Sequence, residues 1–281
     1  MHGGFPLSAE GDAVPACALD LACEVSGRGP PVLLLHGLLA SSANWCGIAE
    51  GLAVSCRVYN VDLRNHGASP WATAMSYASM ADDVLRLIER EGLDAPTLVG
   101  HSMGGKVAMA LALTAPYAVK RLITIDVAPV TYVDRFSHQV QSMIETLARD
   151  PLATQQDASA AHPADAALAH WMLPRLSARH TYVDWRCNLG VIARSMQGLC
   201  AFPRTLRHLS STVSLTAIAG ERSDCVLPAG PALYQPMFPR ATARVVEGAG
   251  HWVHADRPEV LLAELRRALG IRSRQPVARA A

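Results

Sequence analysis

Short apolar runs alternate with amphipathic segments along the first half of the chain. The run PPVLLLHG (30–37) lies between proline and glycine, and CRVYNVDLRNHG (56–67) repeats the form, with an apolar stretch followed by polar residues. Runs of this length predict buried strands rather than helices. Residues 79–92 instead repeat apolar side chains at helical spacing, with Ser79 as the expected N-cap and Gly92 beyond the end.

The same alternation continues along the chain. It gives a strand in APTLVGHS (95–102), a helix in MGGKVAMALALTAP (103–116), a strand in KRLITIDVAP (120–129), strands in TVSLTAIAG (212–220) and ATARVVEG (241–248), and a helix at 258–269. Alternating strands and helices predict an α/β fold, in which a mostly parallel central sheet is flanked by helices on both faces.

Residues 130–210 interrupt this alternation, because they contain helical patterns but no clear strand. Apolar side chains recur at helical spacing at Val140, Met143, Ile144 and Leu147, and again at Leu168, Trp171 and Met172. We therefore expect a helical cap insertion in one core domain. The expected divisions are core 1–129, cap 130–210, core 211–270 and a flexible tail 271–281.

Composition narrows the possible partners and the location of the protein. The 281 residues carry a formal net charge of only +1, so neither nucleic acid nor an anionic membrane is an expected partner. No run approaches the ~20 apolar residues that a membrane span needs. The N-terminus lacks a basic region followed by an apolar region, so no secretory signal is visible and a cytoplasmic location is expected. The oligomeric state is not indicated.

The sequence predicts no disulfide framework, metal or cofactor. Its seven cysteines are dispersed, without a CxxC pair, which is typical of a reducing compartment and argues against a zinc site. No phosphate-binding loop or dinucleotide-binding glycine pattern is present. A chemistry carried by the side chains alone is therefore expected.

The stretch GHSMG (100–104) is the strongest chemical signal. It is a G-x-S-x-G element between an expected strand and an expected helix, which is the context that a nucleophilic serine requires. A sharp turn between small residues exposes the Ser102 hydroxyl at the carboxyl edge of the sheet. The following helix directs its positive end to the same place.

A serine hydroxyl needs a base, and His251 is the best candidate. It follows the last expected strand, and in the fold that carries this motif the chain order is nucleophile, acid, base. His254 could form a metal pair with it if the stretch were helical, but the sequence supplies no third ligand. His101 is expected to pack, and His36 to brace its loop.

The residues alone leave two candidates for the acid. Asp224 follows the penultimate strand and Asp126 ends the strand after the helix of the nucleophile, so both should reach the same edge. The oxyanion hole is expected from the backbone N–H groups of Leu38 and Met103. These residues predict a serine hydrolase of carboxylic ester or thioester bonds. A perhydrolase, a carbon–carbon bond hydrolase and a non-catalytic binding module remain alternatives.

Several stretches together resemble the YbfF-like esterase branch of the α/β-hydrolase superfamily. They are HGLLASSANW, VDLRNHGASP, VGHSMGGKVAMALAL, IDVAPVTY and GAGHWVHADRPE. The resemblance implies an α/β-hydrolase fold, no cofactor, and a short acyl ester or acyl-coenzyme A thioester as the small-molecule substrate. It also implies that Asp126 is the acid, with Asp224 as the alternative, and that Asn65 and His66 shape a loop beside the site.

The expected cap contributes apolar side chains that could line an acyl pocket or only pack the cap on the core. They are Phe136, Trp171, Met172, Trp185 and Met196. The sequence does not decide between these two roles.

Overall fold

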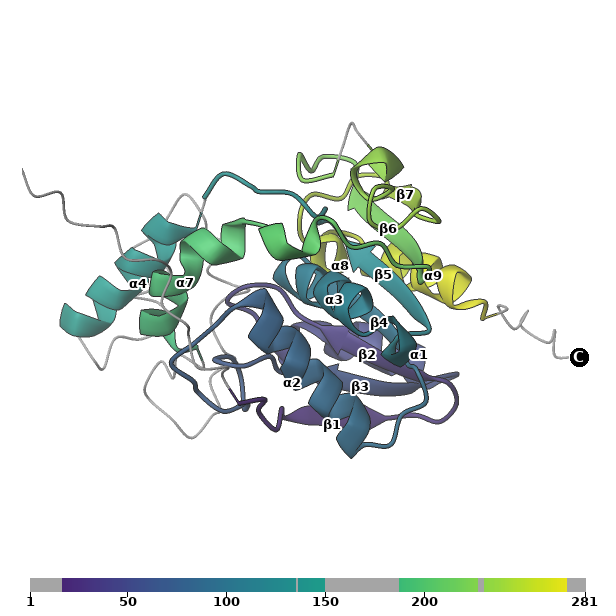
Figure 1. Ribbon diagram of the computed structural model, residues 1–281, viewed down its shortest axis with the longest axis horizontal. Coiled ribbons are helices and arrows are strands. Elements are labelled where there is room, and N and C mark those ends of the chain that lie inside the picture. Colours follow the sequence, from purple (N-terminus) through teal and green to yellow (C-terminus); the bar gives the residue numbers. More distant parts are fainter. Residues whose placement is uncertain (1–16, 135, 150–186, 227–229, 272–281) are drawn as a thin grey trace, which may run out of the picture.

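A computed structural model describes residues 17–134, 136–149, 187–226 and 230–271 (Figure 1). These residues form a sheet of seven strands in the order β1-β3-β2-β4-β5-β6-β7. The strands are β1 (Cys23–Ser26), β2 (Pro31–Leu35), β3 (Arg57–Val61), β4 (Thr97–His101), β5 (Arg121–Ile125), β6 (Ser214–Gly220) and β7 (Thr242–Val246). Strands β2 to β7 pair in parallel, which confirms the predicted α/β fold with a mostly parallel sheet.

The edge strand β1 was not predicted from the sequence. It pairs antiparallel with β3 through only four residues, and three of these are exposed. Its sequence CEVS alternates apolar and polar positions, but over only four residues, which is the shortest run that periodicity can indicate.

Helices cover both faces of the sheet. The described helices are α1 (Cys46–Ala53), α2 (Tyr77–Arg90), α3 (Met103–Thr114), α4 (Ser137–Arg149), α7 (Leu189–Cys200), α8 (Val253–Asp256) and α9 (Pro258–Leu269). Successive side chains of a strand point to opposite faces. Leu33 and Leu35 of β2 accordingly join the core cluster with α2 and α3, whereas Val32 and Leu34 join the cluster with α1 and α9.

The start of α2 corrects one expectation. Ser76, not Ser79, is the N-cap, and its hydroxyl accepts a hydrogen bond from the Ser79 amide at 3.1 Å. The Ser79 hydroxyl in turn accepts from the Ser76 amide at 3.0 Å, which makes a reciprocal capping box. A serine in place of the usual Glu or Gln at the third helical position conceals this box in the sequence.

Two of the described helices, α4 and α7, follow β5 in the chain and lie beyond the carboxyl ends of the strands. Figure 1 shows α4 and α7 side by side at one end of the molecule. The boundaries of the expected cap stay a prediction. Trp171, Met172 and Trp185 lie outside the described residues, as do residues 272–281 of the expected tail. Among the described residues, no helix is long and apolar enough to cross a membrane.

Candidate active site

Ser102 occupies a strained turn between β4 and α3. Its φ is +50°, in a region that residues with a side chain rarely adopt, and its amide donates to the Ile125 carbonyl at 3.0 Å. A Cβ on Gly100 would lie 2.4 Å from the Gly104 carbonyl oxygen, and one on Gly104 would lie 2.4 Å from that of Leu35. The two glycines are therefore needed so that the helix can start directly against the strand ends.

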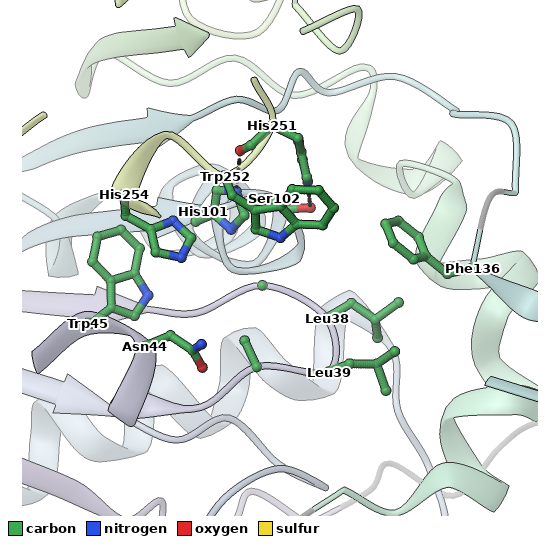
Figure 2. A pocket seen from close by; sticks show the side chains of 12 residues that line it. Leu38, Leu39, Asn44, Trp45, His101, Ser102, Phe136, His251, Trp252 and His254 are labelled. Atoms are coloured by element: carbon green, nitrogen blue, oxygen red, sulfur yellow. Dashed lines mark hydrogen bonds between the residues drawn. The ribbon is translucent and has the colours of Figure 1, made fainter. Parts of the chain in front are cut away.

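The structure brings Ser102, His251 and Asp126 together, although they are far apart in the sequence. The Nε2 atom of His251 lies 3.2 Å from Ser102 Oγ, and its Nδ1 atom lies 2.7 Å from Asp126 Oδ2. Figure 2 shows His251 above Ser102, from the segment that follows β7. A hydroxyl, an imidazole and a carboxylate in this order can transfer a proton away from the hydroxyl.

Asp126 is fixed by several donors at the end of β5. Its carboxylate is buried, and Oδ1 accepts a hydrogen bond from the Gly220 amide at 3.1 Å. Oδ2 also accepts from the Ser223 hydroxyl. These donors stabilise the ionised carboxylate, which would be costly to bury alone. They also hold Oδ2 in place opposite His251.

Asp224 has a different position from Asp126. It is exposed, and its Oδ1 atom lies 4.0 Å from Cys225 Sγ, on the wall of the cavity that also contains Ser102. Both carboxylates thus reach the same edge of the sheet, as the sequence predicts. Asp126 Oδ2 lies at hydrogen-bond distance, 2.7 Å, from His251 Nδ1.

Leu38 and Met103 lie on the wall of this cavity beside Ser102. Met103 is the first residue of α3, so its N–H group is among those at a helix start that have no partner within the helix. Leu38 belongs to the loop after β2. The two residues therefore flank the serine from separate elements.

Two buried histidines brace the loop that contains Leu38. His36 accepts a hydrogen bond from the Leu63 amide at Nε2, at 3.0 Å, and lies 2.7 Å from the Gly37 carbonyl through Nδ1. His66 accepts from the Leu39 amide at 3.2 Å. These contacts link the loop after β2 to the loop after β3, in agreement with the bracing expected for His36 and the loop-shaping role expected for His66.

His251 is electrostatically unlike the other histidines around it. Burial lowers the pKa of the imidazoles of His36, His66, His101 and His254. Burial also acts to lower the pKa of His251, but hydrogen bonds to Asp126 and Cys225 outweigh it and raise that pKa above its ordinary value of 6.5. The carboxylate partner therefore favours a positive charge on this ring.

His101 and His254 pack around His251. The Nε2 atom of His101 lies 2.9 Å from the His251 carbonyl, so an Nε2–H group of His101 would donate to it. The ring of His254 stacks on Trp45, with the centroids 5.1 Å apart (Figure 2). Both rings thus support the segment that carries His251, and His254 is held against an aromatic side chain.

A cavity of about 330 Å³ opens beside Ser102. Its apolar wall includes Phe136 before α4 and Met196 on α7, two of the residues that the sequence offered as pocket lining. A smaller cavity of about 30 Å³ lies between Ser102 and Trp45 (Figure 2). The larger space is of the size that a small ligand needs.

Lys106 is a site residue that the sequence analysis missed. Its ammonium is buried on the wall of the larger cavity and donates to the carbonyls of Cys200 and Ala201 at 2.8 and 2.9 Å. It also lies 4.7 Å from the centre of the Tyr132 ring. Burial lowers the pKa of Lys106 to about 8. The side chain joins α3 to the end of α7, where carbonyl groups favour a cation.

Tyr77 holds the same helix end. Its hydroxyl donates to the Leu199 carbonyl at 2.6 Å. Three successive carbonyls at the end of α7 are therefore bound by side chains of the core. Sequence patterns could not reveal these contacts, because the partners are 94 to 122 residues apart.

The α/β-hydrolase fold family matches residues 30–258. The chain is 34% identical over 241 residues to the sn-1-specific diacylglycerol lipase ABHD11 of Xenopus laevis, which covers 82% of this chain and 76% of the relative. It is 31% identical over 253 residues to esterase YbfF of Escherichia coli strain K12, which covers 85% of this chain and 92% of the relative.

Solved structures agree with these relatives. A structure described as a marine microorganism esterase superposes with a TM-score of 0.80 at 29% identity, and the match covers 89% of this chain and 99% of that one. The resemblance to YbfF-like esterases found in the sequence is thereby confirmed. The chain belongs to the α/β-hydrolase fold family, within the esterase and lipase type of hydrolase that includes esterase YbfF.

Proposed function

We propose that the protein hydrolyses short acyl esters and thioesters through an acyl-enzyme on Ser102. The observation that supports it most is the chain of contacts from Ser102 Oγ to His251 at 3.2 Å and from His251 to Asp126 at 2.7 Å. This chain joins a strained, cavity-facing serine to a base whose orientation a buried carboxylate fixes.

In the first half of the proposed reaction, Ser102 Oγ attacks the acyl carbon while His251 Nε2 accepts the hydroxyl proton. Asp126 stabilises the imidazolium that forms, through Nδ1. The negative charge on the carbonyl oxygen is proposed to be stabilised by the N–H groups of Leu38 and Met103, together with the positive end of α3. His251 then returns the proton to the leaving alcohol or thiol.

In the second half, a water molecule takes the place of the leaving group. His251 removes its proton as the water attacks the acyl carbon, and Ser102 leaves with the proton restored. Each half uses the same three side chains, so the mechanism requires no cofactor or metal. Asp224 is the alternative acid in this proposal.

The size of the cavity supports the short acyl chain that the resemblance to YbfF-like esterases implies. Its volume of about 330 Å³ lies at the lower end of the range of roughly 300–1,000 Å³ that is typical of small-molecule sites. Phe136, Val127 and Met196 give it an apolar wall suited to an acyl chain. The thioester part of the proposal rests on the resemblance to YbfF-like esterases. The cytoplasmic location that we also propose is supported by the dispersed cysteines, which are typical of a reducing compartment.

A substrate panel tests this proposal. The purified protein is assayed with p-nitrophenyl esters from acetyl to palmitoyl and with the matching acyl-coenzyme A thioesters, with Ser102→Ala as the control. We expect hydrolysis of the short-chain oxygen esters and of the short-chain thioesters by the wild type, and none by the control. Hydrolysis of oxygen esters only would contradict the proposed thioesterase activity. No hydrolysis of any member would contradict the function.

A further inference from the structure

The base and the acid of the triad share their hydrogen-bonding face with a thiol. Cys225, in the loop after β6, places Sγ 3.6 Å from His251 Nδ1, on the side of the ring that also contacts Asp126. The Asp224 carboxylate lies beside the same sulfur, with Oδ1 at 4.0 Å. One thiol, one imidazole and two carboxylates therefore meet in a single cluster.

These groups are the ligand types that zinc prefers. Among the described residues, Asp126, Cys225 and His251 offer ligand atoms that all lie within 4.8 Å of one another. In a tetrahedral site, with Zn–S of ~2.3 Å and Zn–N of ~2.0–2.1 Å, the sulfur and the nitrogen are about 3.5–3.6 Å apart. The observed separation of Cys225 Sγ and His251 Nδ1, 3.6 Å, matches this value.

The cluster is accessible through the larger cavity. Asp126, Asp224, Cys225 and His251 all line it, so a hydrated cation can enter by the route that we propose for the substrate. The two carboxylates attract a cation, and Asp126 offers the third ligand atom of the cluster. Dispersed sequence positions explain why cysteine spacing gave no sign of such a site.

We propose that this cluster is an inhibitory site for zinc or a similar thiophilic divalent cation. The ion bonds to Nδ1 of His251 and to the Cys225 sulfur, whose proton passes to water. The remaining ring proton must then lie on Nε2, where it faces Ser102. A ring with that proton cannot accept another from the serine, so the reaction stops while the ion stays bound.

Binding is tested without reference to activity. Co²⁺ is added to the protein, and the thiolate-to-cobalt absorption in the near ultraviolet is recorded for wild type, Ser102→Ala, Cys225→Ser and Cys200→Ser. Cys200 also lines the cavity, on α7, and serves as the matched control. The band is expected in all but Cys225→Ser. A band that persists in Cys225→Ser, or no band in wild type, would overturn the site.

Inhibition is tested for each variant as the ratio of its activity with zinc to its activity without zinc. This second experiment rests on the proposed function. Ester hydrolysis is measured with and without micromolar buffered zinc, and then after addition of a chelator. In wild type and Cys200→Ser, zinc is expected to lower the rate of ester hydrolysis about tenfold or more, and the chelator is expected to restore it. The reason is that the Cys225 thiolate dominates the affinity of the site for zinc. Equal inhibition of Cys225→Ser would overturn the proposal. An inactive wild type that still gives the cobalt band would contradict only the function.

Discussion

At the ends of β4 and β5 the backbone itself fixes the functional side chains, whereas across the cavity α7 depends on two long side chains of the core. Ser102 and Asp126 both have a positive φ, of 50° and 51°, and both amides donate to a neighbouring strand. The end of α7 is held by Lys106 and Tyr77 through hydrogen bonds to its carbonyls.

This difference indicates that the strand ends and α7 have separate roles. Backbone contacts in a sheet cannot adjust without breaking the ladder, so the strand ends suit groups that must stay aligned. Side-chain contacts to a helix end can change without any change in the sheet. We therefore expect substitutions at the strand ends to affect the chemical step, and substitutions around α7 to affect substrate binding.

The largest effect is expected for Ser102→Ala. Loss of the nucleophile should lower kcat for p-nitrophenyl acetate by about 10⁴-fold or more, and His251→Ala should lower it about as much, because members of a triad act as a unit. Circular dichroism should show an unchanged fold. A rate within tenfold of wild type for either variant would contradict the mechanism.

The next largest effect is expected for Asp126→Asn, and it distinguishes the Asp126 carboxylate from that of Asp224. Asparagine keeps the shape of Asp126 but cannot stabilise the imidazolium, and the comparable change in a serine protease costs about 10⁴ in kcat. Asp126→Asn should therefore approach that loss. Asp224→Asn is the matched control and should lose less than about tenfold. The opposite ranking would transfer the role of the acid to Asp224.

The pH dependence of kcat/KM should show the influence of Asp126 on His251. The base must be neutral to accept a proton, so activity is lost as pH falls through the pKa of His251. Because hydrogen bonds to Asp126 and Cys225 raise that pKa, the acid limb should lie above 6.5. An acid limb at or below pH 6.5 would show that Asp126 does not stabilise the positive charge on the His251 ring.

The smallest effect is expected at α7, and the chain offers its own control. Lys106→Met leaves two partly buried carbonyls without their donor, at a total cost of about 1–3 kcal/mol, so Tm should fall by a few degrees. KM for short esters should rise more than kcat falls. Lys120, the other lysine, is exposed, and Lys120→Met should change neither quantity. Equal effects of the two substitutions would contradict the anchoring role.

The sequence predicted the parts of the fold that repeat a simple pattern. The strands of the parallel sheet are short buried apolar runs, and α9 begins at Pro258 and ends at Leu269, as the helical spacing and the following glycine indicate. The strand β1 and the N-cap of α2 were missed. The first alternates apolar and polar positions over only four residues, and the second uses a serine in an unusual capping position.

The candidate site likewise contains residues that the sequence predicted and residues that it could not reveal. Ser102, Asp126 and His251 follow strands, so a sequence that places the strands also places these residues at one edge. Lys106 and Ser223 could not be found in this manner. Lys106 looks like one more position of a helix, and its partners come from α7. The contact of Ser223 with Asp126 depends on how the loop after β6 folds.

The most direct test of the account is where a mechanism-based reagent bonds to the protein. The native protein is treated with a fluorophosphonate, and the modified residue is located by tandem mass spectrometry. One equivalent of label is expected on Ser102, with no label on Ser102→Ala and slow labelling of Asp126→Asn. Stoichiometric label on any other residue, or no label on the folded wild type, would contradict it.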